Sequence, residues 1–392
     1  MQADATPEDQ LILLLARGAL TPHVQAQALV LLAMPLRWDL ILEGAVAHEV
    51  YPLLYRNLRR VGFPGVPADV CIKLEALYKV NAFRNAHLAE ELARVLQLLE
   101  GAGIPTIPLK GVTLAESLYG DATLRVCADI DILVPRPMVT QAFRLLLARG
   151  YRAEFSEQFF ADLFLRHDIE YALMRKERGV SYLLELHWEI LWGAPWDGDA
   201  PQDLWAEAHP QTFFGVPAHA FSPEWDLLFL AAHAARHQWQ GLKWLVDIHE
   251  VCCGREIDWE KAERLGWEEV LRLTLSACHA LFDTPIPAPF SPRSLPPWVK
   301  LFPLDPSPSA IWDGALFPTR LLARPSEKLR YVVRVFFVPT IAERRLCRFP
   351  SLLSFLYYPL RPLRLGCKWG WRLVYASFQR LRAMGKSGGI AV

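Results

Sequence analysis

The chain has 392 residues, of which 52% are hydrophobic and 21% are charged. This composition supplies enough apolar side chains for a large core and excludes an intrinsically disordered protein. The 42 Lys and Arg residues equal the 42 Asp and Glu residues in number, so bulk charge excludes a generic basic nucleic-acid binder. The seven cysteines include no CxxC pair, so we predict neither a disulfide framework nor a zinc ribbon.

The first residues lack a basic segment followed by an apolar one, and no uninterrupted apolar run reaches the ~18 residues of a spanning helix. We therefore expect no secretory signal, no transmembrane segment and a cytoplasmic, reducing compartment. The charge is nevertheless uneven. From residue 320 onward, 15 basic residues face two acidic ones, which leaves +13 in this tail and −13 in the rest. A basic end on an acidic body predicts an interaction surface.

Helices are predicted for residues 1 to about 100, where apolar residues recur every three or four positions. The longest of them covers about 67–100 and ends at a glycine-rich break. After this break the helical periodicity of apolar residues ends. The short apolar segment 104–109 predicts a buried strand, followed by a turn and a helix over 112–119. Residues 128–134 alternate apolar and acidic side chains, as a strand should.

A helix over 138–149 is predicted next, and then two strands, 169–176 and 180–190, joined as a hairpin. Helical spacing returns after about residue 222, and the Pro-rich stretch 284–309 predicts a connector. The predicted fold class is α+β and majority helical, with a small mixed β-sheet core between N-terminal and C-terminal helical regions. The predicted segments are an N-terminal helical region, a mixed-sheet core, a C-terminal helical domain and a basic, aromatic-rich tail: 1–100, 101–221, 222–319 and 320–392.

Asp129 and Asp131 are the most informative residues of the sequence. On a strand, residues two apart point to the same face, so both carboxylates project together. Two neighbouring anions repel each other, and a hard divalent cation relieves this repulsion. Mg²⁺ is the first candidate for this cation and Mn²⁺ the second. The alternative is an edge strand with two solvated acids.

Residues 110–113 (Lys-Gly-Val-Thr) lie at the predicted strand-to-helix turn. Such a turn presents free backbone N–H groups and the positive end of a helix dipole to an anion. Lys110 adds a charge and Thr113 a hydroxyl group. A third acid, Glu185, alternates with apolar residues on a later predicted strand. Phosphoryl-type transfer uses a metal at the phosphate oxygens and a carboxylate near the attacking hydroxyl, whereas Lys110 and the glycine after it, taken alone, indicate only a turn.

Several short motifs follow one another along the chain. They are Leu109-Lys110-Gly111, Leu118-Tyr119-Gly120-Asp121, Arg125, Asp129-Ile130-Asp131-Ile132-Leu133-Val134, Ala142, Leu146, Gly150-Tyr151, Glu185-Leu186-His187-Trp188, Ala232-His233, His237, Lys243-Trp244-Leu245-Val246-Asp247 and Ile257-Asp258-Trp259. In order and spacing this set resembles the uncharacterised bacterial nucleotidyltransferase family of the DNA polymerase β superfamily. The resemblance covers roughly residues 30 to 270.

The resemblance implies a nucleotidyltransferase core in which the first strand–helix turn holds the triphosphate of an NTP such as ATP. It implies transfer of a nucleoside monophosphate to an acceptor hydroxyl, with release of pyrophosphate. The implied nucleotide-binding residues are Lys110, Gly111, Thr113 and Arg125. The implied catalytic carboxylates, which would also hold two Mg²⁺ ions, are Asp129, Asp131 and Glu185.

Two departures from the superfamily pattern leave alternatives open. Val112 follows Gly111 where superfamily members commonly carry Gly or Ser, and the gap to Asp129 is longer than in compact members. One alternative is a catalytically silent nucleotide-binding or scaffold member, and another is a toxin-like nucleotidyltransferase acting on RNA or protein. A sugar-nucleotide-dependent glycosyltransferase would need a longer parallel-sheet region before the acids. The acceptor is a small molecule, peptide, protein or RNA, and the sequence does not choose among them.

Four residues are candidates for an acceptor or base pocket: His187, His233, His237 and Lys243. His233 and His237 lie four apart on one predicted helix, a spacing that can bind zinc. A structural helix face is the alternative, because the Glu of an HExxH motif is absent. His187 either tunes the neighbouring Glu185 or is a partly buried sheet histidine.

Other candidates have ordinary structural alternatives. Arg125 either contacts triphosphate or pairs with Asp121 or Asp129. Lys243 and Asp247 have the spacing of an ordinary helix pair. Candidates for base stacking, which are otherwise core residues, are Trp188, Trp239 and Trp244.

The tail interleaves Arg with aromatic and apolar residues from about 349 to 375. Three interpretations are open: a basic amphipathic segment on anionic lipid, an RNA-contacting patch of aromatic residues and Arg, and a helical cap docked on the acidic body. The first predicts peripheral membrane association of a cytoplasmic protein.

Overall fold

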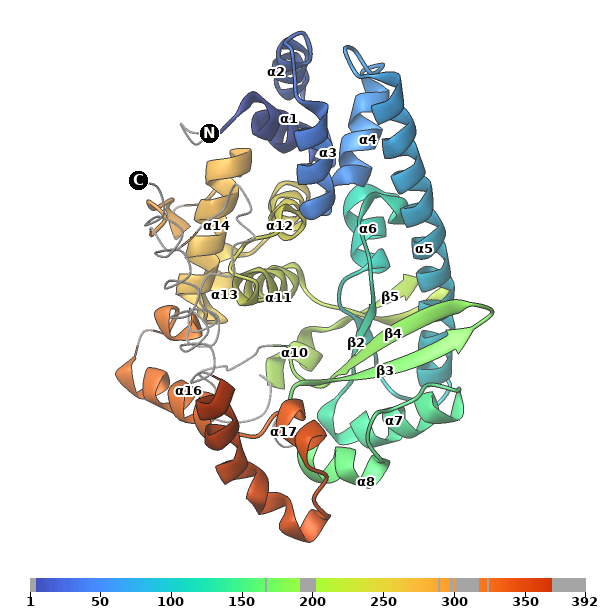
Figure 1. The fold of residues 1–392 in the computed structure, drawn as a ribbon, viewed down its shortest axis with the longest axis vertical. Coiled ribbons are helices and arrows are strands. Elements are labelled where there is room, and N and C mark those ends of the chain that lie inside the picture. Colours follow the sequence, from blue (N-terminus) through green and yellow to red (C-terminus); the bar gives the residue numbers. More distant parts are fainter. Residues whose placement is uncertain are drawn as a thin grey trace, which may run out of the picture. The chain divides into compact units, whose positions relative to one another are not determined.

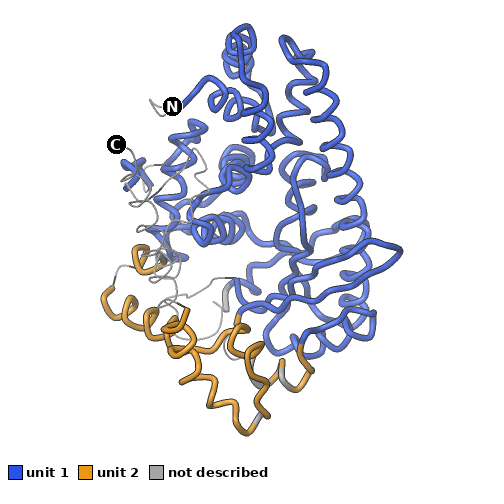
Figure 2. The backbone as a smooth tube through the Cα atoms, viewed as in Figure 1, with its two compact units in different colours: residues 1–154, 169–309 blue, residues 155–168, 310–392 orange. Residues whose placement is uncertain are grey.

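The computed structural model describes residues 5–165, 168–190, 202–287, 290–296, 299, 317–322 and 324–368, and Figure 1 shows its helices and strands. The chain forms two compact units (Figure 2). Unit 1 comprises residues 1–154 and 169–309, and unit 2 comprises residues 155–168 and 310–392. The four segments expected from the sequence, 1–100, 101–221, 222–319 and 320–392, stay a prediction.

Unit 1 begins with helices, as the apolar periodicity predicts. They are α1 (Pro7–Leu15), α2 (Pro22–Leu32), α3 (Trp38–Ala47), α4 (Tyr51–Arg60) and α5 (Ala68–Glu100). The first two begin at a proline preceded by a threonine, Thr6 or Thr21, whose hydroxyl accepts a backbone N–H from the first turn. This is a favourable N-cap because the first N–H groups of a helix have no partner within it. Helix α5 ends at Glu100, before Gly101.

Two buried asparagines of α5 hold the chain segment that leads into the sheet. Asn85 Nδ2 donates to Ala122 O at 2.6 Å and to Arg125 O at 2.7 Å. Asn81 Nδ2 donates to Thr123 O at 2.8 Å and to Arg125 O at 3.1 Å. Buried carbonyl groups require a donor, so these two side-chain amides fix the path of the backbone just before the acidic residues.

The main sheet is small and mixed, as predicted. Its strands are β1 (Ile107–Pro108), β2 (Ile130–Leu133), β3 (Glu170–Glu177) and β4 (Val180–His187), in the order β1-β2-β4-β3. β2 runs antiparallel to β1 and parallel to β4, and β3 and β4 form the expected hairpin. β1 is shorter than the predicted segment 104–109, and β4 ends before the predicted residue 190. The connections include α6 (Val112–Tyr119), the short 3₁₀ helices η1 (Ala122–Leu124) and η2 (Arg136–Met138), and α7 (Val139–Ala148).

A second, two-stranded sheet of β5 (His209–Phe213) and β6 (Val216–Ala220) was not predicted. Apart from Phe213, which is half-buried, every residue of β5 is exposed, so no alternation of apolar and polar residues marks it. A backbone hydrogen bond holds this sheet against the rest of unit 1. His219 N donates to Thr106 O at 2.9 Å, which places β6 beside the chain entering β1.

Helices return where the sequence predicts them. They are α10 (Gln202–Glu207), α11 (Pro223–Arg236), α12 (Leu242–Gly254), α13 (Trp259–Arg264) and α14 (Glu268–Phe282). Helices α11, α12 and α14 pack together, and the buried Trp239 donates from Nε1 to Thr274 Oγ1 at 2.8 Å. Much of the predicted connector 284–309 lies outside the described residues.

Unit 2 is helical in its described part. It contains α8 (Glu157–Phe159), the π-helical turn η3 (Phe160–Phe164), η5 (Phe317–Arg320), α16 (Pro325–Phe337), α17 (Ile341–Leu346), η6 (Ser351–Leu356) and helical residues 357–368. Its interior includes two charged residues. Arg344 Nη1 donates to Asp168 Oδ2 at 3.1 Å. Glu343 forms ion pairs with Arg361, at 3.2 Å, and with Arg364. Some of the positive charge of the tail is therefore neutralised within this unit.

No helix in the described part of the chain is both long enough and apolar enough to span a bilayer.

Replacement of Asn85 by Leu should destabilise the protein by about 2–4 kcal/mol, because two buried carbonyl groups lose their donor. Urea denaturation with a linear extrapolation measures this loss. Gln97→Leu is the matched control, since Gln97 is exposed on the same helix and should change stability by less than about 0.5 kcal/mol. Equal effects of the two substitutions would contradict the role assigned to Asn85.

Candidate metal and nucleotide site

The turn at Lys110 and Gly111 joins β1 to α6. Gly111 has φ 74° and ψ −134°, a conformation that residues with a side chain rarely adopt. An added Cβ would lie 3.6 Å from Asp129 O, which is an ordinary contact, so the requirement for glycine is conformational rather than steric. Thr113 Oγ1 donates to Lys110 O at 3.0 Å. The threonine hydroxyl therefore stabilises the turn itself.

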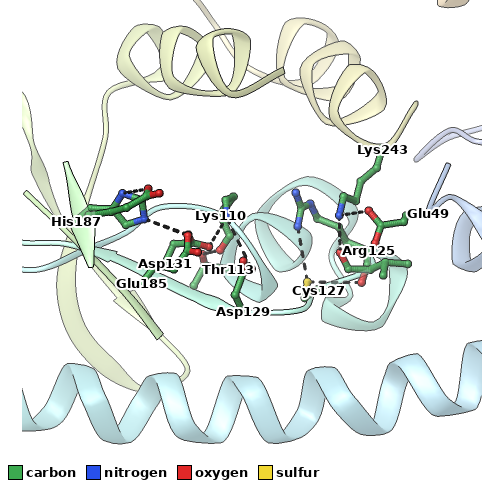
Figure 3. A network of polar contacts seen from close by, with 12 residues as sticks. Glu49, Lys110, Thr113, Arg125, Cys127, Asp129, Asp131, Glu185, His187 and Lys243 are labelled. Carbon is green, nitrogen blue, oxygen red and sulfur yellow. Dashed lines mark hydrogen bonds and ion pairs between the residues drawn. The ribbon is translucent and has the colours of Figure 1, made fainter. Parts of the chain in front are cut away.

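The Lys110 ammonium group lies against both predicted aspartates (Figure 3). Its Nζ is 2.6 Å from Asp131 Oδ2 and 3.7 Å from Asp129 Oδ1. Burial alone would lower the pKa of Lys110, but the two carboxylates outweigh it and the pKa is raised. Lys110 is therefore cationic at neutral pH. The structure brings the lysine–glycine turn and the aspartate pair into direct contact.

Strand pairing places the third carboxylate beside the second. Asp131 on β2 is the register partner of Glu185 on the parallel strand β4, so the two side chains emerge side by side on one face. The alternate residues of β2, Ile130 and Ile132, are buried. Asp129 comes just before β2, and about a quarter of its side chain is exposed. The three predicted carboxylates therefore line one strip of the sheet.

His187 belongs to this carboxylate cluster. Its Nε2 lies 3.2 Å from Asp131 Oδ1 and 3.7 Å from Glu185 Oε2, and its Nδ1 lies 3.3 Å from Glu170 Oε2. Burial lowers the pKa of His187, but hydrogen bonds to Asp131 and Glu185 raise it to about 9. Glu170, which no sequence motif singled out, is the register partner of His187 in the β3–β4 hairpin.

The three carboxyl groups have different proton affinities. Burial raises the pKa of Asp131, but Lys110 and His187 outweigh burial and hold this pKa well below its usual range. Burial and the neighbouring Asp131 charge raise the pKa of Asp129. A hydrogen bond with His187 lowers the pKa of Glu185, but burial and the Asp131 charge outweigh it, so this pKa is also raised. Asp131 is thus the firmly ionised centre of the cluster.

The donor atoms fit a divalent cation. One ligand atom each from Asp131, Glu185 and His187 lie within 4.8 Å of one another, and Asp129 lies on the same strip. Carboxylate oxygens are the ligands that Mg²⁺ and Mn²⁺ prefer, whereas an imidazole nitrogen suits softer metals. The carboxylates would therefore carry the binding of a hard cation, which would compete with the Lys110 ammonium group for Asp131.

Arg125 lies in a separate buried pair, at the other end of the network in Figure 3. Its Nε donates to Asp247 Oδ2 at 2.9 Å, and Asp247 Oδ1 accepts the hydroxyl of Tyr119 at 2.8 Å. Burial lowers the pKa of Arg125, but the Asp247 charge outweighs it and the pKa is raised. The alternative pairing of Arg125 with Asp121 or Asp129 is therefore wrong. Its expected contact with triphosphate stays a prediction.

Lys243 also differs from its structural expectation. Its Nζ lies 2.6 Å from Glu49 Oε2 and 3.3 Å from Val126 O. The predicted helix pair with Asp247 is wrong, because Asp247 points inward to Arg125. Lys243 instead joins α12 to the loop after α3 and to the segment before β2.

His233 and His237 form an aromatic cluster with Trp244. The ring of His237 stacks on Trp244 at 4.3 Å, and His233 meets the same ring edge-on at 5.6 Å. Burial lowers the pKa of both histidines, that of His237 to about 4, so both are neutral at pH 7. Among the residues that can be described, no metal-ligand group contains either histidine.

The three tryptophans considered for base stacking differ in accessibility. Trp188 and Trp239 are at most 1% exposed, so their assignment to stacking on a nucleobase is wrong. Trp244 is half-buried.

A pocket of about 250 Å³ borders the same turn, between β1, α6, the β5–β6 hairpin and the start of α11. Its polar lining includes Thr113 and the ion pair of Asp226 with Arg255, whose atoms are 2.5 Å apart. The four residues predicted for an acceptor pocket, His187, His233, His237 and Lys243, do not line it. No sequence motif indicated this pocket, because its walls come from segments up to 147 positions apart in the chain (Pro108 to Arg255).

The helical majority, the small mixed sheet and the carboxylate cluster define an α+β protein with a candidate site for metal and phosphate. Residues 35–283 match the model of a family described as uncharacterised nucleotidyltransferase. The match covers more than half of the chain, and the protein belongs to this family. The family expected from the sequence motifs is confirmed.

The comparison with solved structures gives a weaker likeness. An antigenic nucleotidyltransferase-like protein from Paracoccidioides brasiliensis is 17% identical, over 51% of this chain and 94% of that chain, with a TM-score of 0.33. A TM-score this low carries no argument about fold or activity. No curated protein matches the chain.

Substitution of Gly111 by Ala should destabilise the protein by about 1–3 kcal/mol, because the turn holds a backbone conformation that alanine resists. Gly254→Ala is the matched control. Gly254 is the last residue of α12, its φ is not positive and its Cβ position is open, so that substitution should be neutral or slightly stabilising. Thermal unfolding of both variants measures the difference, and a tolerant Gly111 would refute the turn geometry.

Asp247→Leu should destabilise the protein by about 3–5 kcal/mol, because it leaves the Arg125 charge buried without a partner. In the double variant Arg125→Leu/Asp247→Leu the unpaired charge is gone, so its loss should be well below the sum of the two single losses. A double-mutant cycle by urea denaturation measures the coupling. Additive losses of stability would show that Arg125 and Asp247 are not coupled as a buried ion pair.

Proposed function

We propose that the protein is a nucleotidyltransferase that depends on a divalent metal, transfers a nucleoside monophosphate from an NTP to an acceptor hydroxyl and releases pyrophosphate. One observation carries this proposal. In the lysine–glycine turn between a strand and a helix, Lys110 Nζ lies 2.6 Å from Asp131 Oδ2 and 3.7 Å from Asp129 Oδ1. A third carboxylate, that of Glu185, is in register with Asp131 on the neighbouring strand β4. Membership of the nucleotidyltransferase family supports it.

Each side chain of the site has a proposed role. Asp129, Asp131 and Glu185 hold the metal, with Mg²⁺ as the first candidate and Mn²⁺ as the second. The bound cation would neutralise phosphate oxygens and the charge that develops on them. Lys110 and the backbone N–H groups at the start of α6 hold the triphosphate, because a helix N-terminus attracts anions.

Two other predicted nucleotide-binding residues hold backbone segments of the site in place. Thr113 holds the turn through its bond to Lys110 O, and Arg125 holds the segment before β2 through Asp247.

The reaction requires a proton acceptor as well as charge. The oxygen of the acceptor hydroxyl attacks the α-phosphorus, and the bond from that phosphorus to the pyrophosphate oxygen breaks. The hydroxyl proton passes to Glu185, which is partly exposed and has a raised pKa. Asp129 shares both properties on the same strip. Lys110 offsets the negative charge of the departing pyrophosphate.

The acceptor is a small molecule, peptide, protein or RNA. The neutral aromatic cluster of His233, His237 and Trp244 offers it, or the base of the nucleotide, an apolar surface. We place the enzyme in the cytoplasm.

A second candidate function is nucleotide binding without turnover. It is favoured by the two cations, Lys110 and His187, that already contact Asp131. If they keep this position when nucleotide binds, the cluster stabilises the fold and takes up no metal.

Asp131→Asn should lower the rate of pyrophosphate release by about a hundredfold or more, because the metal and the phosphates lose their central anion. The assay supplies each NTP with Mg²⁺ or Mn²⁺ and a panel of hydroxyl acceptors. Asp258→Asn is the matched control, because Asp258 caps α13 through Lys261 N and lies outside the cluster. Its activity should be unchanged.

The same variants separate the two candidate functions by metal binding. Titration with Mn²⁺, followed by electron paramagnetic resonance, should show a site in the wild type that Asp131→Asn loses. Nucleotide binding without any metal uptake or pyrophosphate release would refute the enzyme and support the silent member.

A further inference from the structure

A short segment of unit 2 exposes several large apolar side chains. Leu346, Leu352, Leu353 and Phe355 have exposed fractions of 60%, 91%, 41% and 60%. All four lie within ten consecutive residues, at the end of α17 and on η6. We call these four residues the apolar tip. Scattered exposed apolar residues are common on proteins, but a local concentration marks a contact surface.

The buried side chain of Tyr357 holds the segment that carries the apolar tip in place. Tyr357 is fully buried, and its hydroxyl accepts Phe349 N–H and donates to Cys347 O, both at 2.9 Å. The ring of Phe349 lies 5.0 Å from that of Tyr357. These contacts fix the backbone on both sides of Leu352, Leu353 and Phe355 and directly after Leu346. The apolar side chains are therefore exposed on a loop whose backbone is already fixed. A partner that binds this loop does not have to offset the entropic cost of ordering it.

The unit that carries the tip is positively charged. Residues 155–168 and 310–392 contain 16 basic and 6 acidic residues. Arg345 and Arg348 lie within or beside the tip segment and are exposed. Lys328 and Arg330 are exposed on α16. A partner of this unit is therefore expected to be anionic.

The kind of apolar residue favours lipid over nucleic acid. Three of the four residues of the tip are leucines, which offer no ring for base stacking, whereas RNA-binding surfaces use aromatic side chains. Helix α16 repeats the pattern: Leu329, Val333 and Phe337 are exposed at four-residue steps, while Tyr331 and Val335 are buried. Aliphatic residues beside Lys and Arg are typical of surfaces that enter the boundary between headgroups and acyl chains.

We propose that unit 2 docks the protein on an anionic lipid surface, with the apolar tip in the interface and the neighbouring cations on the headgroups. Docking is peripheral, because no described helix is able to span a bilayer. Both signals are needed, since a single apolar anchor gives only weak, reversible attachment. The proposal does not rest on nucleotidyl transfer, so Asp131→Asn should dock like the wild type.

Co-sedimentation of the full chain with vesicles tests the proposal. The wild type should bind vesicles that contain phosphatidylserine, bind pure phosphatidylcholine more weakly, and lose affinity as salt screens the charges. Leu352→Ser/Phe355→Ser should lower the partition onto phosphatidylserine vesicles by about tenfold or more. Leu29→Ser/Val30→Ser is the matched control, because both residues are exposed on α2 of unit 1, and it should bind like the wild type.

Four outcomes would overturn the proposal. They are no binding to phosphatidylserine vesicles, equal binding by the tip variant, binding of single-stranded RNA in place of vesicles, and self-association in sedimentation velocity that the tip variant abolishes without any vesicle binding. Circular dichroism shows whether both double variants keep the wild-type helical content. If the tip variant does not, Arg345→Gln/Arg348→Gln replaces it, and an unchanged partition of that variant would equally overturn the proposal.

Discussion

The contact between the Lys110 ammonium group and Asp131 is the interaction on which the candidate site depends. Asp131 is buried at the centre of a small sheet, where an isolated carboxylate would be costly. Lys110 lies 2.6 Å away and meets this requirement. The lysine lies beside the acid because β1 pairs with β2 and Leu109 N donates to Asp131 O at 3.1 Å, directly before Lys110. The pairing of two short strands therefore supplies the buried carboxylate with its cation.

Contacts outside the cluster hold the acidic strand in place. Asn81 and Asn85 bind the backbone before β2 from α5, and Arg125 fixes it to Asp247 of α12. Lys243 adds a contact to Val126 O. The segment from 122 to 131 is thus attached to the N-terminal helices and to the C-terminal helices of unit 1. Helices α5 and α12 therefore hold the backbone that leads into one short strand.

Local patterns made the centre of the site predictable. The spacing of Asp129 and Asp131, the alternation around them and the turn at Lys110 and Gly111 each depend on a few neighbouring residues. Contacts between distant residues were not predictable in this way. Arg125 and Asp247 are 122 positions apart, and the partner of Lys243 is Glu49, on the loop after α3. Strand register, which no local pattern reveals, brings Glu170 to His187. The mostly exposed strand β5 lacks the alternation that marks a half-buried strand.

The balance of charge in the cluster is compatible with the metal site proposed above. Four carboxylates, Asp129, Asp131, Glu170 and Glu185, lie against Lys110 or His187. Glu170 also pairs with Arg236 at 3.4 Å, so with all groups ionised four negative charges face three positive ones, and a formal charge of −1 remains. Uncompensated buried charge is costly. In the proposed reaction a divalent cation would supply positive charge here, and if it took the place of Lys110 at Asp131, the lysine would become available to the phosphates of a nucleotide.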